Sequence, residues 1–575
     1  MSRIQHRHEL LSELWKIQDQ FGYISQGEMQ RIADALNISV IEVAGVVSFY
    51  HFFHDKPGGK YHIYLNNSII AEHSGYRKIK KAFEEIAGVR FGVRNPNRLF
   101  SLHETACIGL SDSEPACLID FYPFTNLTIS KVNRIIGLLK AGSHPKNICD
   151  HPISEVKVLA QKGQGILFRD YIPGKGLERL KEMEPGVLLQ MLVGSGLSGM
   201  GGAFFPAFIK WKSCRAVEGQ EKYIVCNADE GEPGTFKDRA LLQRVPGLVL
   251  EGMILAGRVV GAKEGIIYLR AEYRYLVDQL QLTINLFKEK NLLGKNILGI
   301  PGFDFNISIQ LGAGAYVCGE ETALLQSMEG FRGEPRTKIF FPTERGYKDK
   351  PTVVNNVETL AMAARIAEIG VEEYQSYGSK GCEGTKLISV SGDCKHPGVY
   401  EIEWGMTLRE VLNVVKAENV FAVQVSGPSG ELCFDQDFDR IISKTDLACG
   451  GSVMIYDYSR DLFDVLQNYN HFFTSESCGV CTPCRVGGYI LKKEIEQLKA
   501  GMSDYEDYRK VYEWSNIMKS ASRCGLGQTA PKAFLQAIDK KPEYFSSLLT
   551  EEHLVNVRFD LQKATQLYED VVSKK

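Results

Sequence analysis

Four cysteines in the C-terminal part of the chain have the type and spacing of a metal site. Cys478, Cys481 and Cys484 form a C-x2-C-x2-C pattern, and Cys524 follows in a separate turn that ends at Pro531. Four thiolates are compatible with either zinc or an iron–sulfur cluster. Structural zinc usually takes two C-x2-C pairs, whereas three close cysteines with one remote partner are typical of iron–sulfur proteins. The spacing therefore favours an iron–sulfur cluster.

A glycine-rich segment provides the second chemical signal. Five glycines fall within nine positions, and they are Gly194, Gly196, Gly199, Gly201 and Gly202. Because glycine adopts positive φ and has no Cβ, such a loop can present consecutive N–H groups to a phosphate. A purely structural turn explains the glycines equally well. The loop on its own is weak evidence for an anion site.

Acidic side chains follow the next predicted strand, Tyr223–Cys226. The loop after it carries Asn227, Asp229, Glu230 and Glu232, and then the basic Lys237 and Arg239. Carboxylates at a strand end usually accept hydrogen bonds from sugar hydroxyls or ring N–H groups rather than binding phosphate. Together, the glycine loop and the acidic loop indicate a nucleotide-like cofactor.

Two further segments complete this pattern, Gly312–Gly330 and Lys350–Leu360. In the first, Gly319, Glu320 and Glu321 begin a predicted helix, whose N-terminus favours an anion. The two acids would repel an anion there. They favour a ribose diol instead, and they disfavour a 2′-phosphate.

The elements that position these residues fall into four segments. Residues 1–54 have the apolar periodicity of a small helical bundle. The order of predicted elements after it suits a small α/β domain of thioredoxin type: a strand over 61–65, a helix over 76–87, strands near 99–102 and over 117–122, and a helix over 130–140.

Strands and helices alternate over 155–375, as in an open α/β sheet. The predicted elements there are helices over 246–260 and 273–289, and strands over 265–269 and 305–310. Residues 384–456 are predicted as strands over 386–391, 398–402, 422–426 and 451–456 with a helix over 408–415. This third segment shows no chemical motif, so we expect it to serve packing or contact with a partner. Residues 460–575 are predicted to be helical.

Composition limits the function classes. A chain of 575 residues with 44% hydrophobic residues and a formal charge of −3 is expected to form about three to five globular domains. It has no run of about 18 apolar residues and no signal-peptide core, so we expect a cytoplasmic protein without membrane insertion. Fourteen cysteines are few for a disulfide scaffold. The near-neutral charge argues against nucleic acid as a partner.

The motifs GGAFFP, NADEGEPGTFKDR, GAYVCGEETAL and KPTVVNNVET resemble the flavin subunit of NADH:quinone oxidoreductase and of soluble NAD-reducing hydrogenases. The resemblance covers about residues 155–545. It implies a Rossmann-like domain for FMN and NAD(H) over 155–380, a β-grasp, ubiquitin-like domain over 384–456, and a helical domain over 460–575. It also assigns the four cysteines to one 4Fe-4S cluster.

The resemblance further implies which residues bind the cofactors. FMN is expected against Gly199, Gly201, Gly202, Lys210, Asn227, Asp229, Glu230, Gly319, Glu320, Asn355 and Asn356. The nicotinamide nucleotide is expected near Glu232, Glu321, Lys338 and Phe341. The flavin carries the chemistry, so no side chain need act as acid or base, although Glu230 and Glu232 line the site. The family usually reads GLRGRGGAGFP, whereas this chain has Ser198, Met200 and Phe204. We expect the loss of two arginines near a phosphate to weaken flavin retention.

The first 150 residues resemble the thioredoxin-like, 2Fe-2S-binding subunit of respiratory NADH dehydrogenases. In that family four cysteines hold the cluster, and alignment puts their positions at Asn66, Ala71, Cys107 and Ser111. One thiolate cannot hold a binuclear cluster, so we expect a domain that keeps the fold and has lost the metal.

Fusion of this domain to the flavin segment resembles the diaphorase flavin subunit of soluble NAD-reducing nickel–iron hydrogenase. The partners that this implies are an iron–sulfur electron-transfer subunit and the hydrogenase subunits. A formate dehydrogenase or NADH:quinone oxidoreductase with an equivalent subunit is the alternative. A non-catalytic scaffold subunit with degenerate cofactor loops is a second one, and the intact cysteines and NADEGEPG loop count against it.

Overall fold

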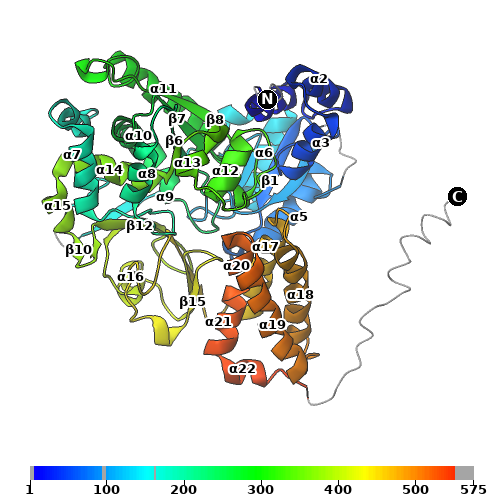
Figure 1. Cartoon of the computed structure of the whole chain (residues 1–575). Coiled ribbons are helices and arrows are strands. Elements are labelled where there is room, and N and C mark those ends of the chain that lie inside the picture. The colour runs from blue at the N-terminus through cyan, green and yellow to red at the C-terminus, as the bar shows by residue number, and fades with distance from the viewer. Residues whose placement is uncertain (1–5, 94–98, 161–162, 551–575) are drawn as a thin grey trace.

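The computed structural model describes residues 6–93, 99–160 and 163–550. Figure 1 shows two α/β regions at the top, formed by the N-terminal and the middle parts of the chain, above a sheet-containing region and a group of C-terminal helices. The predicted helical tail over 460–575 is described up to residue 550, and its last part lies outside the described residues.

The helical prefix begins the chain. Its helices are α1 (Leu10–Phe21), α2 (Gln26–Leu36) and α3 (Val40–Phe49). Ser39 and Glu42 form a capping box at the start of α3. The prefix packs on the central parallel sheet as well as on its own neighbours, since the indole of Trp15 donates to the carbonyl of Gly312 at 3.1 Å.

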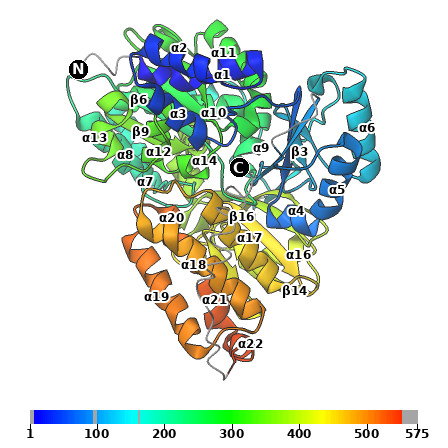
Figure 2. The same cartoon turned by 90° about the vertical axis from the view of Figure 1, so that its right-hand side faces the viewer.

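A four-stranded sheet follows, in the order β2-β1-β3-β4. Its elements are β1 (Tyr61–Asn66), α4 (Ile69–His73), α5 (Tyr76–Ala87), β2 (Phe100–Thr105), β3 (Cys117–Ile119), β4 (Tyr122–Phe124) and α6 (Ile129–Lys140). Helices α5 and α6 pack on one face of the sheet (Figure 2). The single strand predicted over 117–122 is wrong. Asp120 and Phe121 adopt φ values of 48° and 67°, so the chain turns tightly and forms the antiparallel pair β3–β4.

The central sheet is parallel and has the order β8-β7-β6-β9. Its strands are β6 (Tyr223–Ala228), β7 (Glu264–Leu269), β8 (Asn306–Leu311) and β9 (Thr352–Asn356). The helices of this region are α7 (Pro185–Ser195), α8 (Ala207–Ala216), α9 (Lys237–Arg244), α10 (Pro246–Val260), α11 (Val277–Glu289), α12 (Glu321–Met328), α13 (Pro342–Arg345), α14 (Val357–Ile369) and α15 (Val371–Gln375). Because all four strands run the same way, the loops after them meet at one edge, where parallel sheets bind ligands.

A mixed sheet of six strands has the order β15-β14-β16-β12-β13-β5. Its elements are β5 (Val156–Leu159), β12 (Thr385–Gly392), β13 (Gly398–Glu403), α16 (Leu408–Val414), β14 (Val420–Val425), β15 (Glu431–Cys433) and β16 (Ser452–Asp457). A short hairpin, β10 (Gly378–Ser379) with β11 (Cys382–Glu383), precedes it. Strand β5 pairs parallel with β13. The sequence placed residues 155–159 in the flavin segment instead, because a strand as short as the four residues of β5 gives no signal of a distant partner strand.

Helices α17 to α22 form the C-terminal group, shown in orange and red at the bottom of Figure 1. They are α17 (Leu462–Ser475), α18 (Thr482–Lys499), α19 (Tyr505–Ala521), α20 (Gly525–Thr529), α21 (Lys532–Lys540) and α22 (Pro542–Ser546). Within the part of the chain that the structure describes, no single helix has the length and apolar content needed to cross a membrane, although two bent helix pairs pass on length and composition.

Candidate cofactor site

A cavity of about 500 Å³ lies at the carboxyl edge of the central sheet. It gathers loops from β6, β9 and the start of α12 against the six-stranded sheet and α20. The predicted residues that line it are Gly201, Gly202, Asn227, Asp229, Glu230, Glu232, Gly319, Glu320 and Asn356. The structure therefore brings together most of the residues assigned to FMN, together with Glu232 from the set assigned to the nicotinamide nucleotide.

Two glycines of the loop are favoured, one by its backbone conformation and one by a close neighbour. Gly202 has φ of 113°, which other residues rarely adopt. A Cβ on Gly201 would lie 3.3 Å from the Cβ of Asn356, so the loop backbone runs directly over the end of β9. The loop is held at Met200, whose N–H donates to the hydroxyl of Thr359 at 2.9 Å and whose carbonyl accepts from Lys386 Nζ at 3.0 Å.

A buried group of charges supports the loop from below. Glu358, fully buried, accepts hydrogen bonds from Lys386 Nζ and from the N–H of Leu387. Its Oε2 also lies 3.0 Å from Lys237 Nζ, which is 2.6 Å from Asp238. Lys237 and Asp238 line the cavity. Burial disfavours the lysine charge, but its carboxylate neighbours raise the pKa of Lys237 above its ordinary value.

The acids of the cavity have different roles. Asp229 Oδ2 is buried without a hydrogen-bond partner, and burial raises the pKa of this carboxyl to about 8. Glu230 accepts from the N–H groups of Asp238 and Arg239 and from the hydroxyl of Tyr273, so it fixes the start of α9. An orphaned acceptor such as Asp229 Oδ2 is what a ligand N–H or hydroxyl would satisfy.

Glu232 and Glu320 order the other side of the cavity. Glu232 accepts from the hydroxyl of Tyr316 and, at 2.9 Å, from the N–H of Ser429. Glu320 caps α12, with one carboxylate oxygen accepting from the N–H groups of Thr322 and Ala323 at 3.0 and 2.9 Å. Because that oxygen accepts from the first turn of the helix, the negative charge of Glu320 stabilises the N-terminus of α12.

The remaining predicted residues do not line the cavity: Gly199, Lys210, Glu321, Lys338, Phe341 and Asn355. Lys210 Nζ lies 2.5 Å from Glu321, so the two form an ion pair. Asn355 is buried and accepts from the indole of Trp211 at 2.8 Å. Lys338 and Phe341 lie in an exposed segment, where Phe341 is 65% exposed.

Several residues that line the cavity were not predicted from the sequence. Lys237 stood in the acidic loop but was given no role. Ser426, Ser429, Gly450 and Lys532 come from segments that were not expected to take part in the cofactor site. The expectation that residues 384–456 serve only packing or partner contact was incomplete, because their loops form one wall of the cavity. No local motif carried that signal.

The four cysteines come together at the start of α18 and of α20. Burial, together with the neighbouring thiols of Cys481, Cys524 and Cys478, raises the pKa of the Cys484 thiol to about 11. Burial raises the pKa of the Cys524 thiol as well, and the backbone N–H groups of Leu526 and Gly527 oppose that rise. Cys524 also lines the cavity described above. The metal site and the cofactor cavity are therefore adjacent.

The N-terminal region has a different donor set. At the four positions where the resembling family has cysteines, this chain has Asn66, Ala71, Cys107 and Ser111. The sulfur of Cys107 lies 3.6 Å from the hydroxyl of Ser111, and the amide of Asn66 is bonded to Ser68 and Glu114. One thiolate does not fit a binuclear cluster. The loss of the metal stays a prediction.

Three family models match the chain. The Nuo51 FMN-binding domain matches residues 193–365, the thioredoxin-like [2Fe-2S] ferredoxin matches residues 2–140, and the NADH-ubiquinone oxidoreductase-F iron-sulfur binding region matches residues 464–547. The second description names a 2Fe-2S group that was not predicted for this chain. The residues at the ligand positions argue against it.

Similar proteins match over most of the chain. The NAD-reducing hydrogenase HoxS subunit alpha of Cupriavidus necator is 44% identical over 98% of this chain and 96% of its own length. An NADH-quinone oxidoreductase subunit of Aquifex aeolicus is 41% identical over 64% of this chain and 87% of its own. A chain from the crystal structure of an NAD+-reducing [NiFe]-hydrogenase in the H2-reduced state has a TM-score of 0.89 and 33% identity, and the match covers 99% of this chain and 97% of that one.

Proposed function

Because the chain belongs to the family of the alpha subunits of NAD-reducing hydrogenases, we propose that its cavity holds FMN and that the chain passes electrons between NAD(H) and a 4Fe-4S cluster. Cys478, Cys481, Cys484 and Cys524 are the ligands of that cluster. The observation that carries the proposal is the position of Cys524, which lines the same cavity as the glycine loop and the acidic loop. The predicted resemblance to the diaphorase flavin subunits is confirmed.

The cavity residues fit FMN in their chemistry. Gly201 and Gly202 offer backbone N–H groups, and Lys237 offers a cation, to a phosphate. Asp229 Oδ2 and the amide of Asn227 suit the polar groups of a ring or ribityl chain. FMN, when bound, supplies the capacity to take two electrons from NADH and release them singly, so no side chain need act as acid or base.

NAD(H) is expected at the outer side of the site. Glu321 faces Lys210 as an ion pair, and Phe341 offers an exposed aromatic ring. Together with Glu232 and Lys338 they keep the role that the resemblance gives them. A carboxylate near the ribose favours NAD(H) over NADP(H), because a 2′-phosphate would add like charge.

The finer architecture is part of the same proposal. The parallel sheet β8-β7-β6-β9 corresponds to a Rossmann-like domain over 155–380, and the mixed sheet to a β-grasp domain over 384–456 extended by β5. Residues 1–150 form the thioredoxin-like domain, and 460–575 the cluster domain. The partners proposed are an iron–sulfur electron-transfer subunit and the hydrogenase subunits.

The test is electron transfer in the purified chain reconstituted with FMN and iron–sulfide. NADH should reduce ferricyanide and should also produce the electron paramagnetic resonance signal of a reduced cluster. Cys524→Ser should abolish the cluster signal and keep ferricyanide reduction, because that acceptor can take electrons before the cluster. With a scaffold subunit, NADH would neither reduce ferricyanide nor produce the signal of a reduced cluster at saturating FMN.

A further inference from the structure

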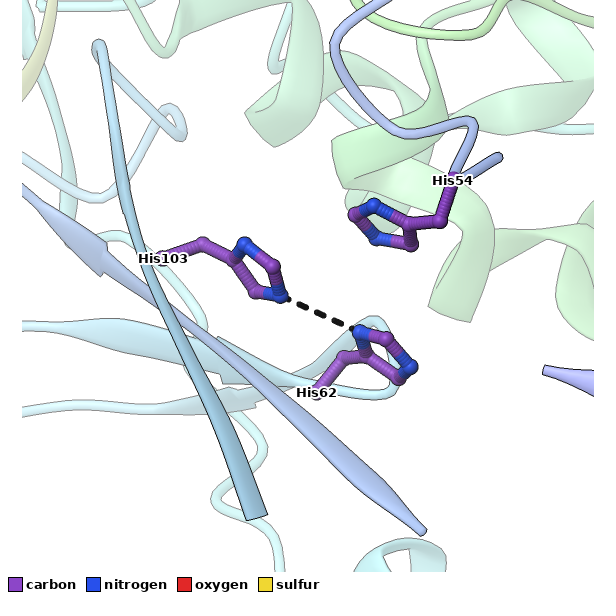
Figure 3. Close-up of side chains that lie close together, drawn as sticks. All are labelled: His54, His62 and His103. Atoms are coloured by element: carbon purple, nitrogen blue, oxygen red, sulfur yellow. Dashed lines mark hydrogen bonds between the residues drawn. The ribbon is translucent and has the colours of Figure 1, made fainter. Parts of the chain in front are cut away.

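Three histidines gather outside the cofactor site, at the junction of the helical prefix and the N-terminal sheet. They are His54 from the segment after α3, His62 on β1 and His103 on β2 (Figure 3). One ligand nitrogen from each lies within 4.8 Å of the other two. Among the described residues, this is the group that meets that criterion for a single metal ion.

The fold places these rings together. In the parallel pair β1–β2, Tyr64 lies opposite His103, and His62 is two residues before Tyr64, so all three share one face of the sheet. His54 is fixed above that face by its backbone, since its N–H donates to Gln18 at 2.8 Å and its carbonyl accepts from Ile24 at 2.7 Å. The cluster is therefore set by the strand register and by the prefix.

The hydrogen bonds inside the cluster are incomplete. His62 Nδ1 lies 3.1 Å from His103 Nε2, a separation close to that of two nitrogens on one tetrahedral zinc ion. His62 Nε2 is buried and has no partner. His54 Nε2 is held by the hydroxyl of Tyr64 at 2.7 Å, the kind of outer contact that orients a histidine ligand. A cavity of about 1190 Å³ lined by His62, Tyr64 and Asp120 gives an ion access.

From this geometry we propose that His54, His62 and His103 form a binding site for a divalent transition-metal ion of the class that prefers imidazole, with zinc as the representative ion. Three nitrogens and no thiolate or carboxylate in the set select Zn²⁺, Ni²⁺ or Cu²⁺ over Mg²⁺ and Ca²⁺. The rings are nearly parallel, with interplanar angles of 9° to 20°. Parallel rings do not all point at one ion, so we expect the rings to turn about their Cβ–Cγ bonds when the ion binds. A fourth coordination position on the ion then stays open for water.

The test uses zinc alone, added to full-length protein that already carries its iron–sulfur cluster, so that the four thiols Cys478, Cys481, Cys484 and Cys524 are occupied. The unmodified chain should retain about one zinc after desalting, with an absorption-edge spectrum of nitrogen and oxygen ligands that includes imidazole. His62→Asn and His103→Asn should each weaken binding at least about tenfold. His151→Asn, an exposed histidine lining the same cavity, is the matched control and should bind as the unmodified chain does.

Tyr64→Phe separates a metal site from a packed stack of rings. It removes the hydrogen bond to His54 while leaving all three ligands, and it should weaken zinc binding by about tenfold. Retention of no zinc by the unmodified chain, equal retention by the two ligand variants, or a spectrum dominated by sulfur would each overturn the proposal. The spectrum of the unmodified chain decides the matter even if a variant folds poorly.

Discussion

Lys386 links the six-stranded sheet to the glycine loop, and its removal should loosen FMN. The side chain is fully buried on β12, donates to the carbonyl of Met200 at 3.0 Å, and pairs with the fully buried Glu358. Lys386→Met removes both interactions while keeping an unbranched side chain. The loop then loses the side-chain hydrogen bond to the carbonyl of Met200.

Two magnitudes follow from these contacts. Breaking a buried ion pair costs about 3–5 kcal/mol. Glu358 keeps Lys237 at 3.0 Å and the N–H of Leu387 at 2.8 Å, so we expect a loss of stability near the lower end of that range. A hydrogen bond from a charged donor contributes about 1.5–3 kcal/mol. Without it, FMN must order the loop as it binds, so part of that free energy is lost from binding and the FMN dissociation constant should rise on the order of tenfold.

The assays are the urea midpoint of unfolding and FMN binding followed by flavin fluorescence. The double variant Lys386→Met with Glu358→Gln removes both charges, so it should recover much of the stability but not the FMN affinity, because Met200 still lacks its donor. Lys212→Met, at an exposed position of α8, is the control and should change neither. If Lys386→Met binds FMN as tightly as the unmodified chain, Lys386 does not position the loop and the reasoning fails.

Four further predictions follow from the same structure. Iron analysis of the reconstituted chain should give about four irons as a single cubane, and a binuclear signal from residues 1–150 would contradict the donor set at Asn66, Ala71, Cys107 and Ser111. NADH should be preferred to NADPH, since a second negative charge a few Å from a carboxylate costs roughly 4 kcal/mol at an effective dielectric of about 20. Glu321→Gln, which also frees Lys210, should lower the ratio of kcat/KM for NADH to kcat/KM for NADPH. Equal use of both nucleotides by the unmodified chain would refute this role of Glu321. Dialysis in reductant should remove FMN because Ser198 and Met200 replace two arginines, and added FMN should restore ferricyanide reduction; a full equivalent retained would disprove the weak retention. Without added metal, the free energy of unfolding should fall as pH drops below about 6.5. Burial lowers the pKa of His54 to about 3, of His62 to about 4 and of His103 to about 2, so the unfolded chain binds protons at a higher pH than the folded chain does. The expected slope is about 1.4 kcal/mol per pH unit for each imidazole, and the urea midpoint should respond less to pH in His62→Gln.

The sequence predicted the bounds of helices whose ends carry a glycine or a proline. The helices expected over 76–87 and 246–260 have those bounds in the structure. Gly88 and Gly261 adopt φ of 73° and 82° at their C-terminal ends, and Pro246 begins the second helix. The β3–β4 turn was missed because Asp-Phe is an unusual pair for positive φ, which glycine and asparagine usually supply.

Long-range pairing was beyond the reach of the sequence. Strand β5 finds its partner β13 far along the chain, and Ser426, Ser429 and Gly450 reach the cavity only through the packing of the two sheets. Each of these residues sits in a loop without a motif. The cofactor residues that were predicted lie in motifs directly after strands of one parallel sheet, where strand direction alone brings the loops together.

The charge of the glycine loop shows how the fold changes the meaning of a motif. In the sequence, Met200 replaces an arginine of the family pattern, which suggests the loss of a cation. In the structure its side chain is fully buried in the apolar core, while the buried lysines Lys237 and Lys386 lie beside the loop and share Glu358. Lys237 lines the cavity, and Lys386 holds the loop backbone. Cationic support for a bound phosphate therefore depends on the packing of two sheets, so stability and FMN retention should vary together when that packing is disturbed.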